Sequence, residues 1–323
     1  MKAIALISGG LDSILAARLI KEQGVEVRGL RFKIPFCHDG TKSVSSLGIE
    51  AKDVNISDDF LKMLENPRYG YGSNMNPCID CKILMLCKAK ELMVQYDAKF
   101  IITGEVLGQR PMSQNKQALE TVVKRAGVEG LVLRPLSAKL LPETIPESKG
   151  WVNRQNLFSF SGRGRKQQIE LARIFGIKEY AQPAGGCLLT DPGFSKRLKD
   201  LMVHDGLRGE DIELLKIGRH FRFSERAKLI VGRNEKENAR LANLARENDY
   251  LFMPTDELAG PTSLGRGILS EELIKLSCSI TCRYCDINGN TNVDIAYRRI
   301  SEKENKVLRI SPIEETKLSS LRI

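Results

Sequence analysis

Short apolar runs alternate with helical patterns along the first two thirds of the chain. Five runs have the length and β-branched content of strands: Ala3–Ile7, Val25–Lys33, Glu50–Asn55, Phe100–Thr103 and Leu131–Leu133. Three segments repeat apolar residues at three- and four-residue spacing and predict helices: Leu11–Gln23, Lys82–Tyr96 and Gly164–Phe175. Because strands that alternate with helices form parallel sheets covered on both faces, the pattern predicts an α/β fold. Ligands of such sheets bind beyond the carboxyl ends of the strands, where the strand order reverses.

The pattern changes after the segment Pro183–Gly193. A short helical stretch follows from Phe194, and the chain becomes β-rich from Ile217 onward. Lys228–Gly232 and Val293–Ile300 are expected to be strands, and Glu235–Asn248 a helix. We therefore expect two domains, a parallel-sheet domain over 1–193 and a smaller α+β domain over 194–323.

Length and composition agree with a two-domain globular protein. The chain has 323 residues, of which 42% are hydrophobic and 28% charged. Its first apolar run is too short for a signal-peptide core, and no run approaches the roughly 18 residues of a membrane span. We therefore expect a cytoplasmic protein. The net charge of +10 suits a polyanionic partner, and most of the surplus lies before residue 188.

The segment SGGLDS, Ser8–Ser13, follows the first expected strand and opens the first expected helix. Its two glycines allow a tight turn in which successive backbone amides point into one concavity. The helix N-terminus adds partial positive charge, and Ser8 and Ser13 can donate hydroxyls to phosphate oxygens. Asp12 could orient Mg²⁺ or cap the turn. The segment is thus a candidate phosphate site, although Ser, Gly and Asp also occur in ordinary strand-to-helix turns.

In this context, Ser8–Ser13 resembles the pyrophosphate-binding loop of the PP-loop ATP pyrophosphatases, which cleave ATP to AMP and pyrophosphate. It lacks the Gly-Lys-Ser/Thr ending of a Walker A loop, which disfavours an ordinary ATPase. The resemblance implies an adenine nucleotide alpha hydrolase-like fold that uses ATP and Mg²⁺. The implied nucleotide-binding residues are Ser8, Gly9, Gly10, Asp12 and Ser13.

Residues 78–114 narrow the resemblance to the tRNA 4-thiouridine synthetases. Their pattern is a Cys-x-x-Cys-Lys helix start, then a Thr-Gly-Glu-x-Leu-Gly-Gln loop with Ser-Gln beyond. The matching loop residues here are Thr103, Gly104, Glu105, Leu107, Gly108, Gln109, Ser113 and Gln114. Leu133–Leu136 and Pro183–Pro192 match later blocks in order, and Asn76–Lys82 is similar to the Asn-Pro-x-x-x-Cys motif of the tRNA 2-thiouridylases. The resemblance covers roughly residues 1–195.

Enzymes of these families transfer AMP to a uridine carbonyl oxygen and then replace that oxygen, which leaves with AMP, by sulfur. A carbonyl oxygen is a poor leaving group, so adenylation makes attack by sulfur feasible, and the enzyme needs a phosphate cradle and charge neutralisation. Gly104, Glu105 and Gln109 end the fourth expected strand, where the nucleotide or substrate should bind. A loop that simply packs well is the alternative interpretation.

The resemblance includes neither the ferredoxin-like and THUMP region nor the rhodanese-like domain of the 4-thiouridine synthetases. The modified uridine and the sulfur donor are therefore not set by it. The donor could be a cysteine desulfurase, a persulfide carrier or sulfide.

Three cysteines are candidates for sulfur handling. Cys78 and Cys81 form a C-x-x-C at the start of an expected helix, where the helix dipole favours thiolates. Cys187 follows two glycines in a loop that the resemblance brings to the active site. The three could hold an iron–sulfur cluster with one open iron position. Alternatively, Cys187 carries a persulfide that Cys81 resolves, or the C-x-x-C pair is structural or binds zinc.

A second set, Cys278, Cys282 and Cys285, has the C-x3-C-x2-C spacing of radical enzymes. Too little chain follows for the barrel those enzymes need, so the sequence disfavours that chemistry. Buried thiols or a small metal site are the expected explanations.

The segment Gly218–Leu241 resembles the NFACT-type RNA-binding domain through its Val-Gly-Arg-Asn sequence, Val231–Asn234, followed by a polar helix. A basic cluster interleaved with Phe221 and Phe223 accompanies it: Arg219, His220, Arg222, Arg226, Lys228 and Arg233. Such a cluster can bind phosphates while a ring stacks on a base. We expect it to bind tRNA in place of the THUMP region. The alternative is an ordinary hairpin with its Phe residues in the core.

Taken together, the sequence predicts an ATP-dependent tRNA uridine sulfurtransferase. The predicted catalytic residues are Asp12, Cys78, Cys81 and Cys187. Two alternatives come from other classes, a PP-loop enzyme that adenylates a small molecule and a non-catalytic RNA-binding factor with a nucleotide-sensing loop. The basic charge disfavours the first, and the intact loop and cysteine sets disfavour the second.

Overall fold

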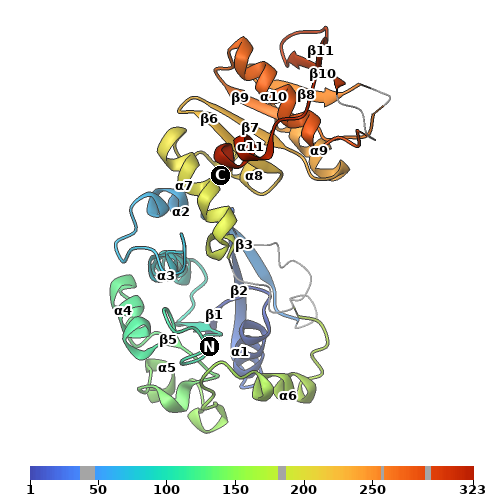
Figure 1. Cartoon of the computed structure of the whole chain (residues 1–323). Coiled ribbons are helices and arrows are strands. Elements are labelled where there is room, and N and C mark those ends of the chain that lie inside the picture. The colour runs from blue at the N-terminus through green and yellow to red at the C-terminus, as the bar shows by residue number, and fades with distance from the viewer. Residues whose placement is uncertain (37–47, 181–186, 256–257, 288–291) are drawn as a thin grey trace. The chain divides into compact units, whose positions relative to one another are not determined.

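The computed structural model describes residues 1–36, 48–180, 187–255, 258–287 and 292–323. These residues form two compact units, Met1–Asp191 and Pro192–Ile323, each with its own sheet (Figure 1). None of the helices in the described ranges has the length and hydropathy that a membrane span requires.

The first unit is built on a five-stranded parallel sheet with the order β3-β2-β1-β4-β5. Its strands are β1 (Lys2–Leu6), β2 (Glu26–Lys33), β3 (Ala51–Asn55), β4 (Phe100–Thr103) and β5 (Val132–Leu133). The order runs outward from β1 in one direction to β3 and in the other to β5, so it reverses between β1 and β4. Leu6 at the end of β1 lies opposite Thr103 at the end of β4. A ligand is expected beyond these two carboxyl ends.

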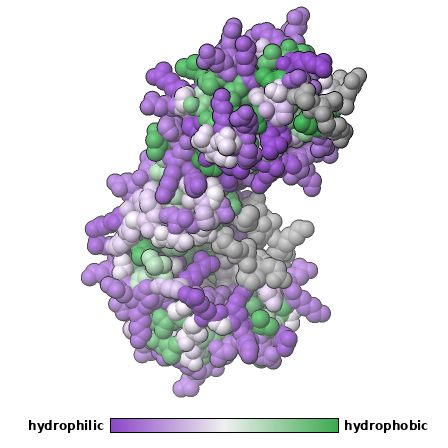
Figure 2. Space-filling view, in the orientation of Figure 1, coloured by the Kyte–Doolittle hydropathy of each residue, from purple (hydrophilic) through white to green (hydrophobic). Residues whose placement is uncertain are grey.

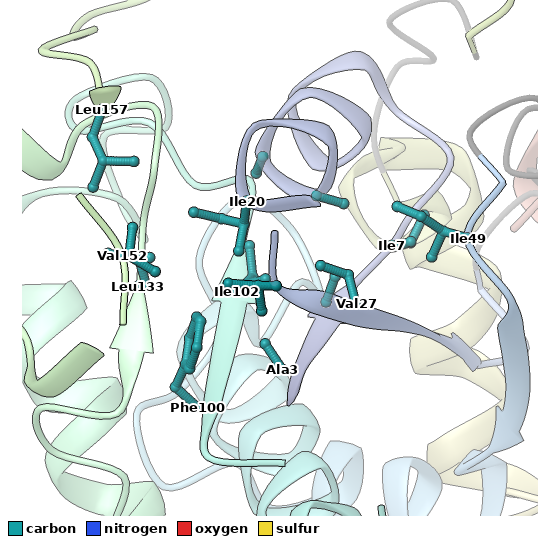
Figure 3. Close-up of a cluster of buried hydrophobic side chains, with 14 of the residues drawn as sticks. Ala3, Ile7, Ile20, Val27, Ile49, Phe100, Ile102, Leu133, Val152 and Leu157 are labelled. Atoms are coloured by element: carbon teal, nitrogen blue, oxygen red, sulfur yellow. The ribbon is translucent and has the colours of Figure 1, made fainter. Parts of the chain in front are cut away.

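Helices cover both faces of this sheet, which explains the nearly continuous apolar runs of its central strands. On one face Ile20 of α1 packs toward Val27 and Ile102 of the sheet (Figure 3). On the other face α3 and α4 pack against each other and, with Ile4 and Ile101, form a second core cluster. The helices of the unit are α1 (Leu11–Lys21), α2 (Ser57–Glu65), α3 (Cys78–Gln95), α4 (Lys116–Ala126), α5 (Ile145–Ser148) and α6 (Lys166–Ile174).

The second unit contains a six-stranded antiparallel sheet with the order β11-β10-β8-β9-β7-β6. Its strands are β6 (Arg219–Ser224), β7 (Ala227–Val231), β8 (Tyr250–Pro254), β9 (Ser263–Gly267), β10 (Val293–Arg299) and β11 (Lys306–Ile310). Its helices are α7 (Pro192–His204), α8 (Gly209–Leu215), α9 (Glu235–Asn243), α10 (Glu271–Arg283) and α11 (Glu315–Leu321). Residues of α10 and α11 share one apolar cluster with the sheet, and residues of α8 and α9 share another.

The predicted fold class is confirmed, since a parallel α/β unit precedes a smaller unit with a separate antiparallel sheet. Hydrophilic side chains predominate over most of the face drawn in Figure 2, as expected for elements whose apolar sides are buried. Sequence analysis missed the helices α2, α4 and α10.

Candidate active site

The loop Ser8–Ser13 joins β1 to α1 and closes on itself through its hydroxyl groups. Ser13 Oγ donates to the Gly10 carbonyl at 2.8 Å, accepts from the Ser8 amide at 3.2 Å, and lies 3.3 Å from Ser8 Oγ. Gly9 has a φ of 79°, a left-handed conformation in which a side chain would be strained. The loop therefore has the tight, glycine-dependent turn that a phosphate cradle requires.

The loop after β4 approaches this turn so closely that only glycine fits. A Cβ atom on Gly104 would lie 2.4 Å from the Ser13 amide nitrogen and 2.5 Å from the Asp12 carbonyl carbon. Backbone atoms cannot move aside cheaply, so Gly104 sets the spacing between the two strand ends. The carboxyl ends of β1 and β4 thus meet where the strand order predicts a ligand.

Asp12 has an incomplete set of partners. Gln109 Nε2 donates to Asp12 Oδ2 at 3.1 Å, whereas Asp12 Oδ1 is buried and has no hydrogen-bond partner among the described residues. Burial raises the pKa of the Asp12 carboxyl, and the bond from Gln109 and the charges of Arg165 and Arg110 partly oppose this rise. A buried carboxylate oxygen without a partner is costly unless a ligand or metal ion supplies one.

Glu105 lies next to Gly104 but is held inside a network of its own. Lys82 Nζ donates to its Oε1, and Arg134 Nε and Thr103 Oγ1 donate to its Oε2 at 2.9 and 3.2 Å. Burial alone would raise the pKa of Glu105, but Lys82 and Arg134 outweigh it and lower this pKa to about 2. Because both of its oxygens are engaged, Glu105 has the geometry of a positioning residue rather than of a direct nucleotide ligand.

Lys82 connects this network to the cysteine helix. It follows Cys81 in the first turns of α3, and its Nζ also donates to the Ser113 carbonyl at 3.0 Å. Arg134 follows β5 and is buried, and its Nη2 has no partner in the part of the chain that the structure describes. Sequence analysis quoted both residues inside motifs but missed their ion pairs with Glu105. A cation directly after an apolar edge strand was the available signal for Arg134.

Cys78 and Cys81 lie in the first turn of α3, both partly exposed. The predicted site residue Cys187 is also partly exposed, while Pro183–Gly186 of its motif lie outside the described residues. The short helix directly after Cys187, η4 (Leu188–Thr190), is tied to the loop before α3. The Met75 amide donates to the Leu189 carbonyl at 3.0 Å, and Asn74 Nδ2 donates to the Thr190 carbonyl at 2.7 Å.

The start of η4 also bonds to the chain beyond β2, where the Leu188 amide donates to the Phe36 carbonyl at 3.0 Å. Cys187 therefore lies at the same carboxyl edge of the sheet as the loop Ser8–Ser13, next to the segment that leads to Cys78. Among the described residues, however, no three His, Cys, Asp or Glu side chains are grouped so that they could hold a metal ion. The expected metal group of Cys78, Cys81 and Cys187 is not assembled here.

Cys278, Cys282 and Cys285 are buried thiols, one of the two explanations expected from the sequence. All three lie in or directly after α10 on the side that packs against the sheet. Burial raises the pKa of Cys278 and of Cys285 to about 12. Their spacing reflects the period of a helix whose one face is in the core.

Three cations of the basic cluster that the sequence expected to bind tRNA are paired with carboxylates of the second unit. Arg222 pairs with Asp200 and Asp205, and the buried Lys228 pairs with Asp205 at 2.7 Å. Arg233 pairs with Glu237 of α9, which leaves only Arg219 and Arg226 of the predicted cations without an acidic partner in the described chain. His220 is buried against the Leu214 and Ile217 carbonyls, and burial lowers its pKa to about 3.

The carboxylates that neutralise Arg222 and Lys228, Asp200 and Asp205, lie outside the segment Gly218–Leu241 that the motif covers, whereas Glu237 lies inside it. Phe221 is fully buried in the core, as the alternative interpretation expected. Most of the cluster therefore stabilises the fold of the second unit.

Comparison with known families agrees with the motifs in both units. Residues 1–140 match the family model described as Thiamine biosynthesis protein (ThiI). Residues 218–322 match the model described as NFACT protein RNA binding domain. These matches confirm the two resemblances that the motifs indicated.

Two similar proteins are named as enzymes of tRNA thiolation. The chain is 36% identical over 242 residues to a tRNA-specific 2-thiouridylase MnmA from Pelobacter propionicus, covering 68% of this chain and 64% of the relative. It is 30% identical over 145 residues to a probable tRNA sulfurtransferase from Ureaplasma urealyticum, covering 42% of this chain and 36% of the relative. The chain thus spans less than two thirds of the length of these relatives.

One similar solved structure is a 4-thiouridine synthetase–RNA complex with bound ATP. It has a TM-score of 0.35 and 18% identity, and the likeness covers 67% of this chain and 52% of that one.

Proposed function

We propose that this protein uses ATP to adenylate a uridine carbonyl oxygen in tRNA and then replaces that oxygen with sulfur. The observation that carries the proposal is the family match over residues 1–140. This range includes the tight SGGLDS loop, in which Asp12 has an oxygen without a partner among the described residues. Relatives named as a tRNA 2-thiouridylase and a tRNA sulfurtransferase support the same reaction class.

The residues of the loop Ser8–Ser13 fit the phosphates of a nucleoside triphosphate. The amides of Gly9 and Gly10 and of the N-terminus of α1 can donate to phosphate oxygens, and Ser8 and Ser13 can exchange their mutual contact for contacts to phosphate. Asp12 Oδ1 is suited to a Mg²⁺ ion, which would neutralise phosphate charge when bound. Arg110 and Arg165 act electrostatically on Asp12 and are further candidates to balance phosphate charge.

The reaction follows from the need for a leaving group. The uridine oxygen attacks the α-phosphorus of ATP and pyrophosphate leaves, so that the oxygen becomes part of an AMP ester. A sulfur nucleophile then attacks the activated ring carbon, and AMP leaves with the former carbonyl oxygen. The chain's task is to hold the phosphates, align the base and keep water away from the activated carbon.

For sulfur delivery we favour a persulfide on Cys187. Its terminal sulfur attacks the activated carbon, and a thiolate of Cys81 then attacks the Cys187 sulfur, which releases thiouridine and leaves a Cys81–Cys187 disulfide for external reduction. The hydrogen bonds that tie residues 188–190 to the loop before α3 support this pairing. Cys78 is proposed as an auxiliary thiol at the same helix start. No step is assigned to an iron–sulfur cluster, because the described thiols form no three-ligand group.

The second unit is proposed to hold the tRNA, since residues 218–322 match an RNA-binding domain. We propose a site of action in the cytoplasm, where tRNA and a persulfide source are both present.

The test is a reconstituted reaction with purified protein, ATP, Mg²⁺, unmodified tRNA, and a cysteine desulfurase with cysteine as sulfur source. We expect AMP and pyrophosphate, and mass spectrometry of the digested tRNA should detect a thiouridine. ADP and orthophosphate as the products would contradict the proposal. Pyrophosphate release that does not require tRNA, with no thiouridine formed, would instead favour adenylation of a small molecule.

A further inference from the structure

Three segments of the second unit bring two arginines onto one tyrosine. Arg219 begins β6, Tyr284 follows α10, and Arg322 follows α11. The Arg219 guanidinium lies over the Tyr284 ring, 4.5 Å from its centroid, and Arg322 Nη2 donates to the Tyr284 hydroxyl at 2.9 Å. Arg322 also lies over the ring of Phe221, 5.9 Å from its centroid. We call Arg219, Tyr284 and Arg322 the arginine–tyrosine patch.

The charges of this patch are not neutralised within the described chain. Arg219 bonds to the Gly232 carbonyl at 3.3 Å, and neither it nor Arg322 has a carboxylate of a described residue within 4.0 Å. Several other arginines of the unit do have one: Arg222 pairs with Asp200, Arg266 with Asp249 and Arg283 with Glu315. Two cations that converge on one ring repel each other, and the ring face only partly compensates. A bound anion would relieve this repulsion.

The patch offers two kinds of contact to one ligand. Guanidinium groups bind phosphate oxygens through paired N–H donors, and their flat faces also stack on bases. Arg322 is exposed, while Arg219 and Tyr284 are partly exposed, so a ligand can reach all three. A polyanion with flat aromatic groups fits this combination better than a simple acidic peptide does. Single-stranded RNA has that chemistry.

We propose that the arginine–tyrosine patch is the surface through which the second unit binds an unpaired segment of tRNA, with phosphates on the two arginines and a base stacked beside Tyr284. The proposal rests on the proposed function and replaces the larger basic cluster that the sequence suggested. All three residues lie inside the range 218–322 that matches the RNA-binding domain.

The test measures binding of unmodified tRNA to the full chain across a series of salt concentrations. The variant Arg219→Gln/Arg322→Gln keeps hydrogen-bond donors but removes two charges. We expect about tenfold weaker binding or worse, and a salt slope smaller by about 1.5, because each lost phosphate contact removes a released counterion. Tyr284→Leu should weaken binding about tenfold through lost stacking and leave the salt slope nearly unchanged.

The matched control is Arg240→Gln/Arg283→Gln, which removes the same charge from two arginines that already pair with Glu213 and Glu315. Its tRNA affinity should stay within about twofold of the unmodified chain. Circular dichroism and a thermal melt check that each variant is folded.

Two outcomes would overturn the proposal in distinguishable ways. If the unmodified chain binds and thiolates tRNA while the patch variant binds as tightly as the control, the patch is wrong and the proposed function stands. If the unmodified chain neither binds tRNA nor releases pyrophosphate in its presence, both fail. A folded patch variant with a raised KM for tRNA and an unchanged kcat would support the patch.

Discussion

The pKa values of two carboxyl groups, one in each unit, are shifted in opposite directions by the surroundings of these groups. Asp12 of the first unit is buried with one oxygen unpartnered in the described chain, and burial raises its pKa. Asp205 of the second unit is also partly desolvated, but Lys228 and Arg222 outweigh burial and lower its pKa. Asp12 thus lacks part of its hydrogen bonding among the described residues, whereas Asp205 has cationic partners.

The cysteines repeat this contrast. Cys78, Cys81 and Cys187 are partly exposed at the carboxyl edge of the parallel sheet, and Cys278, Cys282 and Cys285 are buried in an apolar core. Both sets have spacings that suggest chemistry. The difference indicates that burial and the completeness of polar contacts, rather than spacing, distinguish a candidate site from a structural cluster.

The largest expected effect is the loss of tRNA thiolation when Cys187 is replaced. Replacing Cys187 with Ala should abolish tRNA thiolation, because the proposed persulfide carrier is lost. It should leave the first turnover of tRNA-dependent pyrophosphate release intact, because adenylation precedes sulfur transfer. Quench-flow analysis of pyrophosphate and mass spectrometry of tRNA separate the two steps.

The matched control is Cys278→Ala in the second unit, which should thiolate normally per folded molecule. Normal thiolation by the Cys187→Ala protein would remove the proposed contrast between the two cysteine sets.

Asp12→Asn should lower the rate of pyrophosphate release by about 10²- to 10³-fold, as expected when one preorganised charged group is lost. The same change should raise the melting temperature of the nucleotide-free protein at pH 7. A carboxyl whose folded pKa is raised destabilises the fold once pH exceeds its unfolded value near 3.8, and an amide lacks this charge. Calorimetry and single-turnover kinetics measure both effects.

Asp205→Asn should behave in the opposite way. Its lowered pKa contributes stability above its unfolded value, so the variant should melt earlier at pH 7 yet retain its rate per folded molecule. A stabilised Asp205→Asn protein would contradict the comparison.

Glu105→Gln should destabilise the first unit by about 3–5 kcal/mol at pH 7, since Lys82 and Arg134 lose a buried partner. Because the folded pKa of Glu105 is about 2 and its ordinary value 4.5, this stabilisation is present above pH 4.5 and is lost as pH falls toward 2. Urea unfolding at pH 7 and pH 3 should therefore show a smaller difference between the two proteins at the lower pH. Asp200→Asn, which leaves Arg222 paired with Asp205, should cost less.

The least alkylation in the native protein is expected for the second cysteine set. At pH 8 the native protein should incorporate iodoacetamide at Cys78, while Cys278 and Cys285 stay unmodified because burial holds their pKa near 12. Peptide mass spectrometry gives the extent of labelling at each position, and urea should expose all sites. Equal rates at Cys285 and Cys78 in the native protein would show that the core is open.

Local patterns were sufficient for much of the first unit. The strand Phe100–Thr103 has the predicted bounds, and the helix after Ser8–Ser13 begins at Leu11 as expected. The helix expected over Lys82–Tyr96 begins earlier, at Cys78, so the C-x-x-C pair lies within its first turn. In the second unit the helix expected to reach Asn248 ends at Asn243. Asp249 accepts the Arg246 amide there and holds a turn instead.

The sequence by itself determined the sheet type, the glycine-containing turn Ser8–Ser13 and the likeness of both units to known families, because these depend on short-range periodicity and contiguous motifs. Only the tertiary structure decided which charged residues are available. Lys82, Glu105 and Arg134 come from three separate segments, and the partners of Arg222 lie on α7 and just beyond it. A sequence does not show whether a charged residue is paired, because its partner depends on how distant segments pack together.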